Sequence, residues 1–248
     1  MLSVIMPTRN ERENVELLIY TLLSILDPPT GGEFELLVVD DSNDGSDAYL
    51  AERLKPYERV RFHHRARGTG LGTAIGDGVE MATRRYVLAM DTDFNHNPLE
   101  LPRLLAGLKQ ADLVGGSRFL SGGDMPGHRF RYHCSRTFNL FVRRSLGITT
   151  TDNLAGFWVA ERERILALKR QWDFFYGYGD YYIRLLLAGH LLGWRVEELP
   201  VRYLQRLTGE SKTSFVKELR RYTGTVLALR KEIPELRRRL ATLDGPGS

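Results

Sequence analysis

Two carboxylates separated by one residue, Asp91 and Asp93, follow an apolar run that ends at Met90. Carboxylate oxygens are hard ligands that hold divalent cations such as Mg²⁺ or Mn²⁺ and bridge them to phosphate groups. A cation held in this way offsets the negative charge that develops on a departing nucleoside diphosphate. Because an Asp-x-Asp pattern also arises by chance, it predicts a metal site only if other polar clusters lie beside it.

Two such clusters follow apolar runs nearer the start of the chain. Their hydroxyl, amide and carboxylate groups can hydrogen-bond the edge of a base and a ribose. The clusters are formed by Pro7, Thr8, Asn10 and Glu11, and by Asp40 and Asp41. A polar loop that leads to a helix cap has the same composition as the second cluster, so for that cluster taken alone both interpretations stay open.

The glycine-rich segment 68–74 resembles a dinucleotide fingerprint but does not match it, because Thr73 occupies the last position of the pattern. It also lacks the lysine-serine pair of a P-loop. Arg65 and Arg67 precede the segment. We therefore predict a mobile loop near a phosphate, which passes through Gly70 and opens a helix.

Short apolar runs alternate with stretches of helical period through the first 120 residues. They predict strands at 3–6, 36–39, 60–63, 86–90 and 113–115, and helices at 13–26, 47–54, 71–82 and 99–109. This alternation predicts an open, mostly parallel α/β sheet flanked by helices. Because ligands of such sheets bind beyond the carboxyl ends of the strands, the three polar clusters are expected to share one edge. The pattern from 129 to 204 is mixed, with a further strand-like segment at 194–203.

The bulk composition narrows the class of protein. A hydrophobic content of 42% and a charged content of 27% exclude a disordered or collagen-like chain. Cys134 is the single cysteine, which excludes an internal disulfide and suits a reducing compartment. Apolar runs fall short of the roughly 18 residues that a membrane-spanning helix needs, and the first residues resemble a buried strand rather than a leader. We therefore expect a cytoplasmic protein, peripheral to any membrane it contacts, with no nucleic-acid partner.

A basic amphipathic helical tail, 214–248, is expected to follow a catalytic domain of residues 1–213. Residues 214–243 hold eight basic and three acidic side chains. Apolar residues recur there in a strict alternation of four and three, the pattern of a coiled-coil seam. The seam consists of Phe215, Leu219, Tyr222, Val226, Leu229, Ile233, Leu236, Leu240 and Leu243.

Three interpretations of this seam compete. It packs on the catalytic domain, pairs with another copy, or lies on an anionic membrane with its basic flanks toward the headgroups. A narrow seam with excess positive charge favours a homo-oligomer, followed closely by a membrane surface, over internal packing. Pro234 interrupts the pattern and predicts a kink or a restart of the helix.

As an ordered set, these motifs resemble the inverting glycosyltransferases of family two, which have the GT-A fold. Within that family they are most similar to the dolichol-phosphate, or polyprenyl-phosphate, mannose synthases. The resemblance spans roughly residues 2–213. It rests on segments 4–11, 38–41, 70–74 and 90–93 with His96 and Pro98, on 116–118, and on Arg206 with 209–212.

The resemblance implies a role for each site residue. The nucleotide-sugar would be held by Pro7, Thr8, Asn10, Glu11, Asp40, Asp41, Gly70, Asp91 and Lys212. The metal would be held by Asp91 and Asp93, with Asn95 as a further ligand. Arg118 would meet a phosphate of the donor or the acceptor, and Arg206 would close over the pyrophosphate with Lys212. Arg131 and Ser135 resemble the acceptor-phosphate element of the family, and at this spacing they share one face of a helix.

The nature of the acceptor separates the alternatives. A lipid phosphate is already anionic and can attack the sugar without a general base, so arginines need only position it. A hydroxyl acceptor needs a carboxylate base, for which Asp180 is the candidate. The family suggests a donor of the GDP-mannose or UDP-glucose type. An inactive nucleotide-binding scaffold is the third hypothesis, which the intact Asp91 and Asp93 disfavour.

Overall fold

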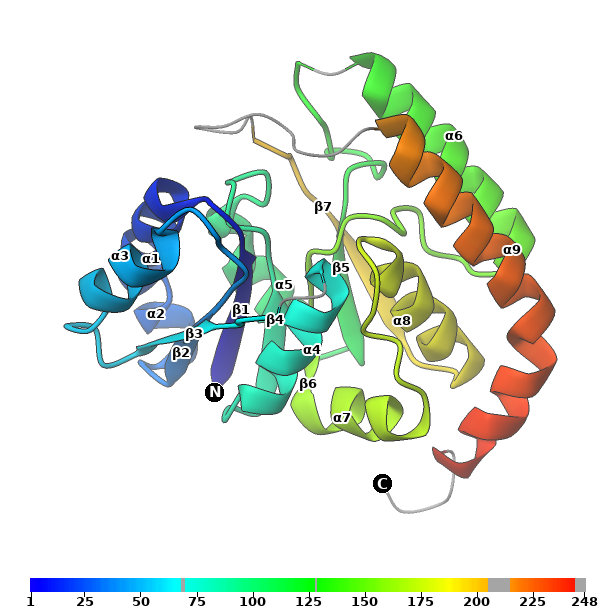
Figure 1. Ribbon diagram of the computed structural model, residues 1–248. Coiled ribbons are helices and arrows are strands. Elements are labelled where there is room, and N and C mark those ends of the chain that lie inside the picture. Colours follow the sequence, from blue (N-terminus) through cyan, green and yellow to red (C-terminus); the bar gives the residue numbers. More distant parts are fainter. Residues whose placement is uncertain (68–69, 128, 205–214, 244–248) are drawn as a thin grey trace.

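The computed structural model describes residues 1–67, 70–127, 129–204 and 215–243 (Figure 1). Within these ranges, seven strands form one sheet in the order β3-β2-β1-β4-β6-β5-β7. The strands are β1 Leu2–Thr8, β2 Phe34–Asp40, β3 Val60–His64, β4 Tyr86–Ala89, β5 Leu113–Ser117, β6 Trp158–Glu161 and β7 Val196–Pro200. The α-helices are α1 Arg12–Ile25, α2 Asp27–Thr30, α3 Ser46–Arg53, α4 Leu71–Met81, α5 Leu101–Gly107, α6 Arg129–Leu146, α7 Arg162–Gln171, α8 Asp180–Leu191 and α9 Phe215–Leu240.

The predicted open, mostly parallel sheet is confirmed. Strand β1 pairs in parallel with β2 on one side and β4 on the other, which brings the carboxyl ends of these three strands to one edge. Strand β6 is antiparallel to both neighbours, β4 and β5. Its four residues were not recognised as a strand, because so short a run has no readable period.

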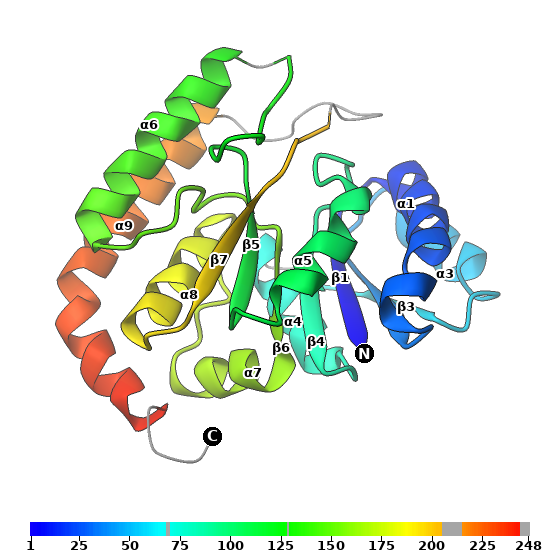
Figure 2. The ribbon, with the colours of Figure 1, turned by 180° about the vertical axis from the view of Figure 1, so that it is seen from behind.

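Helices cover both faces of the sheet (Figures 1 and 2). Successive residues of β2 point to opposite layers: Leu37 and Val39 share a core cluster with residues of α4, whereas Leu36 and Val38 share the other cluster with residues of α1 and α3. The strand is therefore buried on both sides, as parallel strands usually are, which explains its continuous apolar sequence.

The seam of α9 packs on the rest of the chain, the interpretation that the sequence pattern favoured least. Helix α9 lies along α6 and contacts α8 and α7 (Figure 1). Five seam residues are buried in the core shared with these helices, namely Tyr222, Val226, Leu229, Leu236 and Leu240. Leu219, Ile233 and Leu243 are partly buried and pack against it. The helix also continues through Pro234 without a restart. The apolar positions are therefore covered within the chain, whereas the exposed face of α9 is basic.

Replacing Leu229, which is 2% exposed, with alanine is expected to lower the free energy of unfolding by about 2–5 kcal/mol. Leu227, 47% exposed on the same helix, provides the matched control, and its alanine variant should change stability by less than about 0.5 kcal/mol. Urea unfolding at several protein concentrations measures both effects. A midpoint that rises with protein concentration would instead indicate that the seam pairs two copies.

Candidate active site

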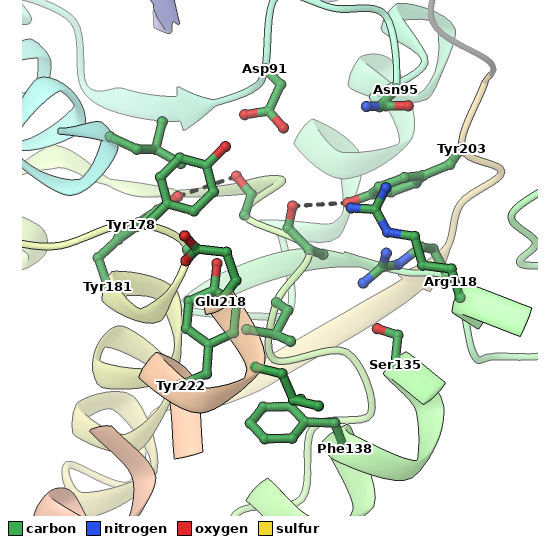
Figure 3. Close-up of a pocket in the computed structure, with 17 residues that line it drawn as sticks. Asp91, Asn95, Arg118, Ser135, Phe138, Tyr178, Tyr181, Tyr203, Glu218 and Tyr222 are labelled. Atoms are coloured by element: carbon green, nitrogen blue, oxygen red, sulfur yellow. Dashed lines mark hydrogen bonds between the residues drawn. The ribbon is translucent and has the colours of Figure 1, made fainter. Parts of the chain in front are cut away.

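A cavity of about 290 Å³ lies beyond the carboxyl ends of β4 and β5, next to the N-terminal turns of α6, α8 and α9 (Figure 3). It combines acidic, basic and aromatic side chains from segments far apart in the chain. Its lining consists of Leu71, Asp91, Asn95, Arg118, Arg131, Ser135, Phe138, Leu154, Ala155, Gly156, Tyr178, Gly179, Tyr181, Tyr203, Glu218, Leu219 and Tyr222.

The loop after β4 presents Asp91 to this cavity. The backbone of Phe94 has a φ of 63°, a left-handed conformation that turns the loop back on itself. The buried carboxylate of Asp93 accepts hydrogen bonds from the backbone N–H of Asn95 at 3.0 Å and from its amide at 2.7 Å. The side chain of Asp91 is 41% exposed and lines the cavity. Asp91 and Asn95 therefore line the cavity, and the buried Asp93 is bonded to Asn95 beside it.

The buried ring of His96 supports Asp91 from inside. Its Nδ1 accepts the backbone N–H of Asp91 at 2.9 Å, so the ring proton is on Nε2. Nε2 then donates to the carbonyl of Ala155 at 2.9 Å and lies 2.9 Å from the hydroxyl of Tyr203. Burial lowers the pKa of His96 from 6.5 to about 4, so the ring is neutral at neutral pH.

This neutral histidine should make the fold sensitive to acid. Below pH 6.5 the unfolded chain protonates His96 while the folded state resists until about pH 4, so stability is lost as the pH falls through that window. The loss should reach about 3 kcal/mol at most. Urea unfolding across the window measures it, and the variant His96→Gln should show a flatter dependence. An equal slope in both proteins would contradict the assignment.

Arg118, at the end of β5, is held by a buried carboxylate. Its Nε and Nη2 donate to the two oxygens of Asp152 at 2.7 and 2.8 Å. Burial opposes the charge on Arg118, but the adjacent Asp152 outweighs it and raises the pKa of the guanidinium. Glu198 accepts the backbone N–H groups of Thr151 and Asp152 and fixes the loop that carries this partner. Arg118 therefore reaches the cavity with one bidentate edge already occupied.

Arg131 and Ser135 stand one turn apart on α6, and both line the cavity. A buried asparagine anchors this part of the helix. The Asn139 amide donates to the carbonyl of Ser135 at 3.0 Å, and its oxygen accepts the backbone N–H of Asn153 at 2.7 Å. The same loop carries Asp152, so Asn139 joins the helix that carries Arg131 to the loop that holds Arg118.

The second polar cluster lies at the next strand end but is occupied by protein partners. Asp40 is buried and bonds Ser42 and the Nδ1 of His64. Asp41 forms an ion pair with Arg65. Arg65 also reaches the carboxylate of Asp77 at 2.9 Å, so the arginine expected near a phosphate ties this loop to α4 instead.

The first cluster joins the other two. Asn10 exchanges hydrogen bonds with Asn43 after β2, and Glu11 accepts the hydroxyl of Thr92 at 2.9 Å. The hydroxyl of Thr8 is buried and has no partner among the described residues, which leaves a polar group for a ligand. The 290 Å³ cavity itself is not lined by Pro7, Thr8, Asn10, Glu11, Asp40, Asp41 or Gly70. The Glu11–Thr92 hydrogen bond links the first cluster to the residue next to Asp91.

Asp180 begins α8 but does not line the cavity. It is 2% exposed, and its oxygens accept the Nη2 of Arg184 at 2.6 Å, the hydroxyl of Thr225 at 3.0 Å and the backbone N–H of Tyr178 at 2.8 Å. The carboxylate therefore joins α8 to α9. Arg206 and Lys212 lie outside the described residues.

Sequence reasoning missed the contribution of α9 to the cavity. Leu219 and Tyr222 were assigned to the seam, and Glu218 received no role. At their end of the seam these positions turn toward the loop after β4 as well as toward the core (Figure 3). The aromatic segment 172–182 is divided: Phe174 is core, and Tyr178 lines the cavity.

Solved structures share this fold. The chain is similar to glucosyl-3-phosphoglycerate synthase from Mycobacterium tuberculosis in complex with Mn²⁺, UDP and phosphoglyceric acid, at a TM-score of 0.66 and 22% identity over 93% of this chain and 78% of that one. It is also similar to a mannosyltransferase from Pyrobaculum calidifontis in complex with GDP-Man and Mn²⁺, at a TM-score of 0.59 and 18% identity over 100% of this chain and 76% of that one. The fold is that of the GT-A glycosyltransferases.

Sequence comparison narrows this class to a family. The family model "Glycosyl transferase family 2" matches residues 3–166, and the chain belongs to that family and is a glycosyltransferase. It is 33% identical over 215 residues to undecaprenyl-phosphate mannosyltransferase of Micrococcus luteus, over 85% of this chain and 86% of that one. It is 34% identical over 218 residues to polyprenol monophosphomannose synthase of Mycolicibacterium smegmatis, over 85% of this chain and 80% of that one.

Proposed function

We propose that this glycosyltransferase moves a hexose from a nucleotide-sugar of the GDP-mannose or UDP-glucose type to a polyprenyl phosphate, with inversion at the anomeric carbon. The cavity carries the proposal, because Asp91 and Asn95 of the β4 loop and Arg131 and Ser135 of α6 all line it. Figure 3 shows Ser135 across the cavity from Asp91 and Asn95. One wall therefore suits a cation and diphosphate, and the other suits a second anion. The polyprenyl-phosphate relatives in Micrococcus and Mycolicibacterium support this acceptor.

A divalent cation fits the acidic wall. Asp91, Asp93 and Asn95 would hold Mg²⁺ or Mn²⁺ through oxygen atoms, the ligands that both cations take. No group of three His, Cys, Asp or Glu side chains suited to a metal occurs in the described ranges, and Mg²⁺ commonly needs only one or two carboxylates beside substrate phosphates. Bound there, the ion would offset charge on the departing diphosphate. The solved neighbours that contain Mn²⁺ with UDP or GDP-Man support this assignment.

The chain's own residues position the acceptor. Arg131 and the hydroxyl of Ser135 would bind the acceptor phosphate and aim one of its oxygens at the anomeric carbon. That oxygen forms the new bond from the face opposite the leaving diphosphate, so configuration inverts as the old bond breaks. Apolar side chains of Phe138, Leu154 and Leu219 also line the cavity and suit the first part of an isoprenoid chain.

The alternative acceptor, a sugar or small-molecule hydroxyl, required Asp180 as a base. A base must lie within hydrogen-bond reach of the proton that it removes. Asp180 lies outside the cavity lining and is paired with Arg184 at 2.6 Å. This geometry favours the phosphate acceptor, which needs no base.

The proposal is tested by a transfer assay on the purified chain. GDP-mannose and UDP-glucose, each radiolabelled in the sugar, are incubated with Mg²⁺ or Mn²⁺ and either undecaprenyl phosphate or a free hexose. We expect metal-dependent label in the organic-extractable lipid fraction, and its loss with a chelator. Transfer to the hexose with none to the lipid would refute the acceptor, and transfer unaffected by the chelator would refute the metal.

We also propose that the acceptor is reached at an anionic membrane surface by the paired helices α6 and α9. No described helix is both long and apolar enough to cross a bilayer. Helix α6 carries five arginines and no acidic residue, and α9 adds eight basic residues against three acidic ones. Exposed apolar side chains lie among these charges, with Phe130 at 80%, Leu140 at 40% and Leu227 at 47%. This combination suits acidic headgroups.

Reversing two of these charges, with Arg136→Glu and Arg144→Glu together, should weaken binding to vesicles rich in phosphatidylglycerol at least about tenfold. Binding should also weaken with salt. Arg84→Glu with Arg170→Glu is the matched control, because both arginines are exposed and lie outside α6 and α9. Co-sedimentation with vesicles measures the effect. Equal losses in the two double variants would show that only net charge matters and would refute a specific surface.

A further inference from the structure

If the proposed function holds, the transferred hexose must occupy the cavity, and this inference rests on that function. The anomeric carbon has to lie between the diphosphate beside Asp91 and the acceptor phosphate beside Arg131, because it exchanges one for the other. Both residues line the same 290 Å³ space. The sugar hydroxyls then need polar partners from the rest of that lining, since a buried hydroxyl without a partner is costly.

Glu218 supplies a carboxylate to this space from an unexpected element. It lies in the first turn of α9, and its side chain is 14% exposed. Figure 3 shows the carboxylate pointing from α9 into the cavity below Tyr178. Its nearest cation is Arg221 on the same helix, with Nη1 3.5 Å from Oε2, at the limit of a hydrogen bond. Within the described part of the chain, Oε1 makes no hydrogen bond.

The surroundings of Glu218 suit a sugar better than a second phosphate. The rings of Tyr178, Tyr181 and Tyr222 line the same side of the cavity, and aromatic rings pack against the apolar faces of small ligands. A carboxylate accepts two hydroxyl hydrogen bonds and, being ionised, makes each of them stronger than a neutral acceptor would. It would repel a phosphate, which would therefore bind on the side of the cavity that carries Arg131.

We infer that Glu218 binds hydroxyl groups of the transferred hexose and thereby makes the enzyme distinguish a nucleotide-sugar from the bare nucleotide. The C-terminal helix is then part of the donor site and does more than cover the core. Glu218 acts by accepting hydrogen bonds from the sugar and takes no proton in the transfer.

Binding measurements separate this role from others. Calorimetric titration in Mn²⁺ compares GDP-mannose with GDP, and UDP-glucose with UDP, for the wild type and Glu218→Gln. The variant should bind the preferred nucleotide-sugar about tenfold to a hundredfold more weakly, as expected for one charged hydrogen-bonding group. Its affinity for the matching nucleoside diphosphate should stay within about twofold of the wild type. Glu218→Asp, which keeps the charge but withdraws it, should show a smaller loss in the same direction.

Glu235→Gln is the matched control, because Glu235 is an exposed acid of the same helix paired with Arg238. It should change neither affinity. The inference is overturned if Glu218→Gln binds the nucleotide-sugar as the wild type does, even where turnover is lost, since that result would indicate a general base. It is equally overturned if nucleotide and nucleotide-sugar weaken together, which would indicate a structural role. If Glu218→Gln weakens binding of the nucleotide-sugar alone, and the wild type forms no lipid product in the transfer assay, the role of Glu218 is supported and the lipid acceptor is refuted.

Discussion

Sugar transfer by the variant Asp91→Asn is expected to fall about a thousandfold or more in kcat/KM. Asp91 is the acidic side chain of the β4 loop that lines the cavity, and asparagine keeps its shape while removing the charge that would hold the cation. The loss should be accompanied by weaker metal-dependent binding of the nucleoside diphosphate. Initial rates at several Mn²⁺ concentrations and calorimetric titration with GDP or UDP measure the two effects.

Glu58→Gln provides the control for Asp91→Asn, because Glu58 is exposed and remote from the cavity. Both variants should unfold within about 0.5 kcal/mol of the wild type, since the side chain of Asp91 is 41% exposed. A variant that retains more than about a tenth of the wild-type rate at saturating metal would show that Asp91 is not needed to hold the cation.

Arg131→Gln is expected to lower kcat/KM for polyprenyl phosphate about a hundredfold, because a charged, bidentate contact to the acceptor is lost. Slow hydrolysis of the donor by water should continue, since the residues proposed to hold the metal are unchanged. Arg131→Lys should recover only part of the loss, because lysine restores the charge without the planar fork. Rates measured against acceptor concentration, with hydrolysis followed in parallel, test this expectation.

Arg136 provides the comparison, because it is an exposed arginine of the same helix outside the cavity lining. Arg136→Gln should leave kcat/KM for a short, detergent-soluble polyprenyl phosphate within about twofold. If Arg131→Gln slowed donor hydrolysis as much as transfer, the arginine would act on the donor and not on the acceptor.

The core of the fold follows from local sequence patterns. Strands β1, β2 and β4 are buried on both faces, so each is a mostly apolar run that can be recognised in the sequence. Polar residues that follow such runs must meet at the carboxyl edge of a parallel sheet. The bond between Glu11 and Thr92 and the bonds between Asn10 and Asn43 show that the three clusters do meet there.

The region from 129 to 204 was less readable because its elements depend on distant partners. Strand β6 has four residues and pairs antiparallel with β4, about seventy positions earlier in the chain. Helix α6 buries Phe138 and Val142 against α9, which comes later in the sequence. The strand is too short to show a period, and the helical spacing of Phe138, Val142 and Leu146 does not reveal α9 as the partner of α6.

The sequence of α9 likewise did not reveal which surface its seam packs against. An alternation of four and three apolar residues specifies a helix with one buried stripe, and that much is confirmed by Tyr222, Val226 and Leu229. The stripe has the same period whether it packs on another copy or on its own chain. Only the positions of α6, α7 and α8 decide between these partners.

By itself, the sequence determined the sheet, its polar edge and the identity of the groups that gather there, because apolar period and strand-end position are local properties. The tertiary structure alone decided which of those groups face a ligand. Arg118 lines the cavity with one edge held by Asp152, Asp180 is paired with Arg184 outside the lining, and Glu218 reaches the cavity from the last helix. The reason is physical: the partners and the direction of a charged side chain depend on segments far away in the chain, which only folding brings together.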